Sequence, residues 1–321
     1  MASDASAPTA ETVSFDDLIA PPRTEPDRRP SFWLAFLVGI VAAVVMITPL
    51  WVNGLRLPLQ NLWNSQTLPG DMPVALLTLS QYEVFSVFAA VLLGGVLAGF
   101  GIRMLRRWRP MRAWAAALGV LLVHLIVTVQ SFGVLGAGLG VTDGTAGTMQ
   151  LMYFAGMLGA VVLGILLSQL GVLLTTRRSP ALAALALALS AVWIGQWVGT
   201  VIAGLWGIAN YPTFLLPAMQ WLPVVIVGVA LVWCGVRPWS RIFVWIAGLL
   251  ALWVLPAAIT AVGYAVGSRV FRGDVAEMSQ AVAQIFPQAL EIGVPQVAVA
   301  AAIGVVGTVV RMLVSRRPTS A

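Results

Sequence analysis

Eight apolar runs determine what this chain can fold into. Each is long enough to cross the roughly 30 Å hydrocarbon core of a bilayer, which takes about 20 helical residues. Charged residues make up 9% of the chain, against about 25% in a soluble domain, so they are too few to cover a water-facing surface. The sequence therefore predicts an all-α fold, a polytopic membrane helical bundle of about eight transmembrane helices. The runs cover residues 32–52, 84–102, 113–133, 151–175, 181–205, 214–236, 242–266 and 295–314.

Arginine marks alternate connections between these runs. All 18 basic residues are arginine, and 15 of them lie before the first run, at or after the end of the last run, or in the even-numbered gaps. Because arginine is retained on the cytoplasmic side, we expect both termini to be cytoplasmic and the protein to lie in the plasma (inner) membrane. The arginines that carry this pattern are Arg28, Arg29, Arg106, Arg107, Arg109, Arg177, Arg178, Arg237, Arg316 and Arg317.

The same pattern predicts the organisation of the chain. Residues 1–31 are expected to be a disordered cytoplasmic tail, because they are polar and rich in proline, serine and acidic residues. Residues 32–314 form the transmembrane domain, and 315–321 a cytoplasmic C-terminal tail. The domain consists of four out-facing helical hairpins, with outer loops at about 53–83, 134–150, 206–213 and 267–294. In the last loop, apolar residues at helical spacing predict an amphipathic helix, kinked near Pro287, on the membrane surface or over the bundle mouth.

Polar side chains are sparse within the apolar runs. His124, the sole histidine, lies near the middle of the third run, and Thr128 and Ser131 follow at i+4 and i+7, on the same helix face. An ionisable residue inside a membrane helix is a functional candidate, so this stripe could carry a proton or hold a polar substrate. The alternative is a neutral histidine that is hydrogen-bonded to a neighbouring helix. Gln196 in the fifth run is the next polar candidate, and an interhelical hydrogen bond is its expected use.

Small residues recur at four-residue intervals in several runs. Such stripes allow helix backbones to approach closely, so they predict tight helix packing. The glycines expected at these contacts are Gly95, Gly99, Gly156, Gly164, Gly195, Gly199 and Gly304.

Several classes of function lack their usual residues. One histidine and one cysteine cannot form a bis-histidine haem site, an intrachain disulfide or a multi-cysteine metal site, so we expect no metal and no cofactor. The net charge of +6 does not indicate nucleic acid, because the arginines lie at membrane boundaries. We find no Walker motif, serine-hydrolase elbow or zinc-binding helix, and no catalytic residue is assigned. Asp71 and Glu83 in an outer loop are expected to be solvated charges rather than catalytic acids.

Three functions remain open. The sequence favours a non-catalytic membrane scaffold or accessory subunit of a cell-envelope complex, because polar residues that could line a pathway are few. Its expected contacts are the lipid bilayer and a membrane or cytoplasmic protein partner. The alternative is a transporter or permease subunit for a lipidic or uncharged small substrate. The third is an enzyme acting at the outer leaflet.

Overall fold

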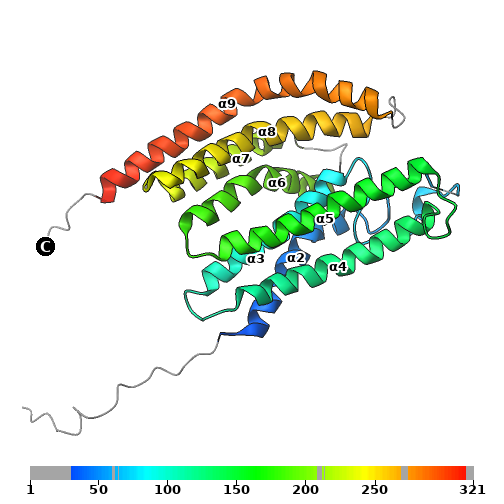
Figure 1. Cartoon of the computed structure of the whole chain (residues 1–321), viewed down its shortest axis with the longest axis horizontal. Coiled ribbons are helices and arrows are strands. Elements are labelled where there is room, and N and C mark those ends of the chain that lie inside the picture. Colours follow the sequence, from blue (N-terminus) through cyan, green and yellow to red (C-terminus); the bar gives the residue numbers. More distant parts are fainter. Residues whose placement is uncertain are drawn as a thin grey trace, which may run out of the picture.

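Eight long helices run side by side in the computed structural model of the chain (Figure 1). The structure describes residues 30–59, 62–63, 65–207, 212, 214–268 and 274–315. Both predicted tails, with Arg28, Arg29, Arg316 and Arg317, lie outside these residues. The helices are α2 (Phe32–Val52), α3 (Val84–Leu105), α4 (Ala113–Gly138), α5 (Thr148–Thr176), α6 (Pro180–Trp206), α7 (Leu215–Cys234), α8 (Ile242–Gly267) and α9 (Val275–Ser315).

Length and composition make all eight helices candidate membrane spans, as predicted. The protein is therefore a polytopic integral membrane protein with an all-α fold. Short 3-10 turns at Pro69–Asp71 and Trp239–Arg241 are the other helical segments of the described residues. Local sequence explains several helix ends. The Ser31 hydroxyl accepts the Leu34 amide at 3.3 Å before α2, and Gly207 and Gly235 adopt positive φ where α6 and α7 end.

The chain folds as two halves of four helices each (Figure 1). Within the first half, α2 contacts α3 and α4, α3 also contacts α4 and α5, and α4 contacts α5. The second half has the equivalent set of contacts: α6 contacts α7 and α8, α7 also contacts α8 and α9, and α8 contacts α9. The halves meet mainly through α6, which packs against α2, α3 and α5. Because both halves have four spans, they run in the same direction through the membrane, as parallel repeats do.

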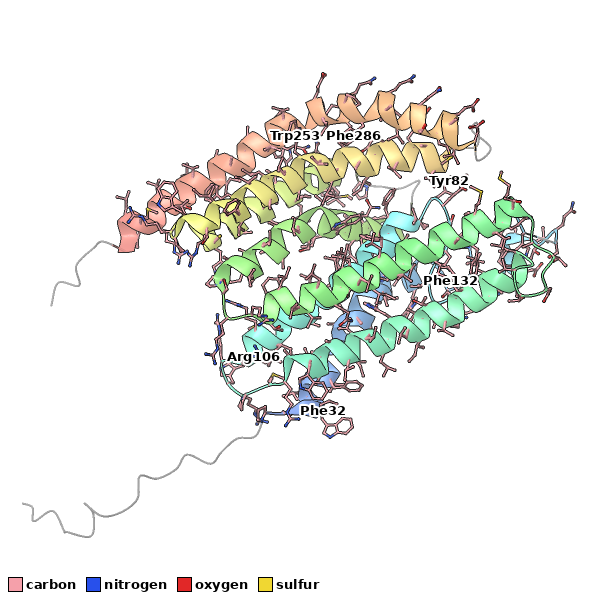
Figure 2. The ribbon with its side chains drawn as sticks, in the orientation of Figure 1. Phe32, Tyr82, Arg106, Phe132, Trp253 and Phe286 are labelled. Carbon is pink, nitrogen blue, oxygen red and sulfur yellow. The ribbon has the colours of Figure 1, made fainter. Side chains whose placement is uncertain are left out.

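The bundle has two chemically different ends. We call the end that carries connections 106–112, 177–179 and 235–241, together with both described chain ends, the arginine end. The opposite end, with the described residues of 53–83 and residues 139–147, is the loop end. Figure 2 labels Arg106 at the arginine end and Phe132 in the half of α4 nearer the loop end.

The last outer loop differs from the prediction. Residues 275–294 are helical as expected, but they do not form a separate surface helix, because α9 continues without a break through Pro287 and Pro295. At a rise of 1.5 Å per residue its 41 residues span about 61 Å, twice the hydrocarbon thickness. The Trp253 indole of α8 donates to the Leu290 carbonyl at 2.9 Å, which anchors α9 near these prolines. The 134–150 loop is also shorter than predicted, because α4 ends at Gly138 and α5 begins at Thr148.

Close helix contacts are found at most of the predicted glycines. A Cβ at Gly95 would overlap the Ser168 carbonyl of α5, and one at Gly99 would overlap the Thr175 hydroxyl. Hypothetical Cβ atoms lie 2.6 Å from a Met219 atom at Gly199 and 3.0 Å from a Pro223 atom at Gly195. At Gly304 and Gly164, they lie 3.0 Å from Trp245 and 3.4 Å from Phe88.

Gly156 does not fit this expectation. A Cβ there would meet nothing within 4 Å, and the residue is exposed. The reason is geometric, because a four-residue step advances 400° around a helix with 3.6 residues per turn. Between Ser168, which faces α3, and Gly156, three such steps rotate the stripe by about 120°. The far end of the stripe therefore points away from the contact.

Candidate functional site

His124 lies at the junction of α2, α3 and α4. Its side chain is fully buried, and a Cβ at Gly94 of α3 would lie 3.1 Å from the His124 Nε2 atom and 3.2 Å from the Ala43 Cα of α2. The imidazole therefore fills a space that exists because residue 94 is glycine. Neither imidazole nitrogen has a hydrogen-bond partner among the described residues, so the expected bond to a neighbouring helix is not found there.

The rest of the polar stripe reaches toward the loop end. Thr128 is buried, and its hydroxyl also lacks a partner in the part of the chain that the structure describes. Ser131 is fully buried, and its Oγ accepts the Leu77 amide at 2.8 Å. Gln196 is not part of this group, because its side chain donates to the Ser86 hydroxyl at 3.4 Å and links α6 to α3. The four predicted polar residues therefore do not form one site.

The segment that binds Ser131 belongs to the long connection between α2 and α3. Leu57, Met72, Leu77 and Leu79 of this connection are at most 1% exposed, so it folds back into the mouth of the bundle. It is held by side chains from two helices. The Gln130 amide group accepts from Leu76 N at 2.8 Å and donates to Val74 O at 2.9 Å. The Trp51 indole donates to Leu76 O at 2.9 Å.

Sequence reasoning missed Gln130. It lies one residue before Ser131 and off the helix face shared by His124 and Thr128, so helical periodicity does not group it with them. Its amide provides partners for two backbone groups of this connection, the Leu76 amide and the Val74 carbonyl. The signal that could have found it is a glutamine in an apolar run opposite a long outer connection.

A large apolar groove lies between the two halves of the bundle, beside their contact through α6. Its volume is about 540 Å³, within the range of small-molecule sites. The one hydroxyl among the residues that line the groove belongs to Ser190, and it already donates to the Leu187 carbonyl at 3.0 Å. Inside the groove the Phe88 and Trp193 rings pack with centroids 4.5 Å apart, across the α3–α6 contact. Lining residues come from α3 (Phe88, Leu92, Val96), α5 (Ala160, Leu163, Leu167, Gly171, Leu174), α6 (Ala186, Leu189, Trp193) and α8 (Leu255, Ala258, Ile259).

The groove is long and partly open. Along α5 it extends from Ala160 to Leu174, which is about 21 Å of helix and more than one leaflet of a ~30 Å hydrocarbon core. Leu163 and Leu170 on its rim are 51% and 43% exposed. The rim is therefore accessible to hydrocarbon from the surrounding membrane.

Five of the arginines predicted from topology converge at the arginine end. Arg106, Arg107, Arg109, Arg177 and Arg178 line one hollow of about 830 Å³, and Arg103 joins them. Arg237 lies outside this set. No group of three or more potential metal-ligating side chains is found among the described residues.

Comparison of the chain with protein-family models, with curated proteins and with solved structures gives no match. The groove, the polar stripe and the arginine hollow are therefore the features from which a function can be inferred.

Proposed function

We propose that this protein is a permease, or the membrane subunit of one, that binds a lipidic substrate in the groove between its two four-helix halves. The observation that carries the proposal is the apolar groove of about 540 Å³ at this interface. Transporters built from two parallel repeats hold their substrates at the repeat interface near the membrane midplane. The shared set of helix contacts in α2–α5 and α6–α9 supports this comparison.

The chemistry of the groove favours a lipid over a polar solute. A polar ligand would lose its hydrogen bonds to water and find almost none in return, which costs several kcal/mol per group. An acyl chain has no such requirement, and it can enter from the bilayer past the exposed rim of Leu163 and Leu170. The scarcity of polar pathway residues, which favoured a scaffold from the sequence, is no obstacle for such a substrate.

The positive-inside rule supports an orientation and a location. With the arginine end cytoplasmic, both termini face the cytoplasm of a plasma (inner) membrane, and the folded 53–83 connection faces outward. The groove then reaches toward the cytoplasmic leaflet through Leu174.

Groove-filling substitutions test the proposal. Ala160→Trp and Ala258→Trp would insert large rings from opposite walls, whereas Ala155→Trp adds the same ring at an exposed position of α5. Native mass spectrometry of protein extracted in mild detergent measures the lipid retained per molecule. We expect the wild type and Ala155→Trp to retain lipid and the two groove variants to lose it. Equal retention in all four proteins, or a co-purifying protein helix in place of lipid, would contradict the permease proposal.

A further inference from the structure

The arginine end contains a pocket with an unusual charge. Arg103, Arg106, Arg107, Arg109, Arg177 and Arg178 line the hollow of about 830 Å³, and no acidic residue does. We call this set the arginine pocket. It lies where the end of α3 and the α3–α4 connection meet the end of α5, around Arg106 in Figure 2.

Two of these arginines are held in place by the end of α5. The last carbonyls of a helix lack intrahelical partners and attract cations. Arg103 donates to Arg177 O at 2.6 Å, and its guanidinium lies 5.2 Å from the Trp233 ring centre. Arg106 donates to Thr176 O at 2.7 Å. The pocket is thus partly preorganised.

The positive charges of the pocket are not neutralised by the described part of the chain. Within those residues, none of the six arginines forms an ion pair with a carboxylate. Partial burial of the guanidinium and the neighbouring charge of Arg178 lower the pKa of Arg106, as expected where cations are crowded together. The positive-inside rule explains positive charge at this end of the bundle, but it does not require six arginines around one hollow.

The pocket lies beyond the groove on the same two helices, α3 and α5. Val96 lines the groove and Arg103 lines the pocket, and these residues are seven apart on one face of α3, about 10 Å along the helix. On α5 the step is shorter, from Leu174 in the groove to Thr176 in the pocket. Trp108, 63% exposed, also lines the pocket and is a side chain suited to the headgroup region.

The geometry points to a phosphate site: the arginine pocket binds the phosphate of an anionic phospholipid whose acyl chain occupies the groove. This inference rests on the proposed function and adds the substrate class to it. Arginine binds phosphate through paired N–H donors, and these charge-assisted bonds are about twice as strong as neutral ones. A zwitterionic headgroup has a cation that six guanidinium groups would repel.

Arg178 offers the cleanest test, because it is exposed and its side chain donates no hydrogen bond among the described residues. The probes are phosphatidylglycerol, phosphatidylcholine and inorganic phosphate, added to the purified full-length protein, with binding measured by native mass spectrometry. We expect phosphatidylglycerol to bind more tightly than phosphatidylcholine. Arg178→Gln should weaken phosphatidylglycerol binding on the order of tenfold, the loss of one charge-assisted bond, and leave phosphatidylcholine unchanged.

Arg237→Gln is the matched control, because it removes the same charge from the same end of the bundle, outside the pocket. It should leave both affinities unchanged. An equal loss in Arg237→Gln would mean that general surface charge is responsible, and equal affinities for the two lipids in the wild type would also overturn the inference. Inorganic phosphate binding as tightly as phosphatidylglycerol would identify a site for free phosphate instead.

The proposal for the groove and the proposal for the arginine pocket can be refuted independently. If Ala258→Trp weakens both lipids while Arg178→Gln weakens only phosphatidylglycerol, groove and pocket act on one lipid, as inferred. If Ala258→Trp changes neither affinity but Arg178→Gln remains selective, the proposed groove function is wrong and the phosphate site stands alone. If Ala258→Trp weakens both lipids and Arg178→Gln changes neither, the phosphate site is refuted and the groove retained.

Discussion

Substitution by alanine should change the stability of the protein in opposite directions at two glycines that have the same sequence pattern. Gly95 and Gly156 both belong to four-residue stripes of small residues. In a helix, alanine is more favourable than glycine by roughly 0.5–1 kcal/mol when nothing opposes it. Gly156 has open space at its Cβ position, so Gly156→Ala should stabilise the protein by about that amount.

Gly95→Ala should instead be destabilising. Its Cβ would overlap the Ser168 carbonyl, a backbone group fixed within α5, and the Gly95 amide already donates to the Ser168 hydroxyl at 2.9 Å. Overpacking of this kind costs about 1–3 kcal/mol, which exceeds the gain in helix propensity. The gain in helix propensity is common to both variants, so they should differ by the overpacking cost alone, about 2 kcal/mol at the middle of its range.

Thermal unfolding in one detergent provides the assay. A difference of this size corresponds to roughly 4–8 °C in Tm on the scale of mid-sized domains, with Gly156→Ala at or above the wild type and Gly95→Ala below it. If Gly95→Ala were as stable as Gly156→Ala, α3 and α5 could not be packed backbone to backbone at Ser168.

Three further predictions concern other parts of the molecule. Gln130→Leu removes two hydrogen bonds to the backbone of the 53–83 connection, one part-buried and one exposed, so it should lower stability by about 1–2 kcal/mol and speed proteolysis of that connection; unchanged proteolysis would mean that Gln130 does not anchor it. A cysteine at Gly70 should react with an impermeant thiol reagent in intact cells and one at Ser179 should not, and the reverse result would invert the proposed orientation. His124→Gln should preserve abundance and function if the imidazole only fills space; a well-folded but inactive His124→Gln protein would instead identify a proton carrier, because an amide does not titrate near neutral pH.

The helices were predictable from sequence because bilayer thickness sets the length of an apolar run, which is a local property. The sequence predicted an amphipathic helix kinked near Pro287 and a separate span from residue 295, whereas α9 is one continuous helix through both Pro287 and Pro295. Within a membrane protein, neighbouring helices satisfy the freed backbone groups, and proline is tolerated. The continuity of α9 therefore depends on its contacts with α7 and α8, which no local pattern reports.

The candidate site was predictable only in part. Residues His124, Thr128 and Ser131 do share a face of α4, because helical periodicity determines that relation. The contacts of that face depend on other helices, so Gln130 and the folded 53–83 connection were missed. The arginines were identified for their sidedness, yet their convergence around one pocket requires the ends of α3 and α5 to meet. Spaced glycines likewise identify one face of a helix, but they do not show which part of that face contacts another helix, as Gly156 demonstrates.

The central claim is that lipid occupies the groove between the two halves, and a phospholipid with a photoreactive acyl chain tests it most directly. After irradiation of the protein in bilayers, mass spectrometry locates the adducts. We predict that they concentrate on the groove-lining residues within 163–174 of α5 and 255–262 of α8. The exposed apolar face of α9, with Val305, Val309 and Leu313 at 53%, 49% and 61% exposure, is the internal control. Adducts that follow exposure alone, with α9 labelled more than the groove, would contradict the account.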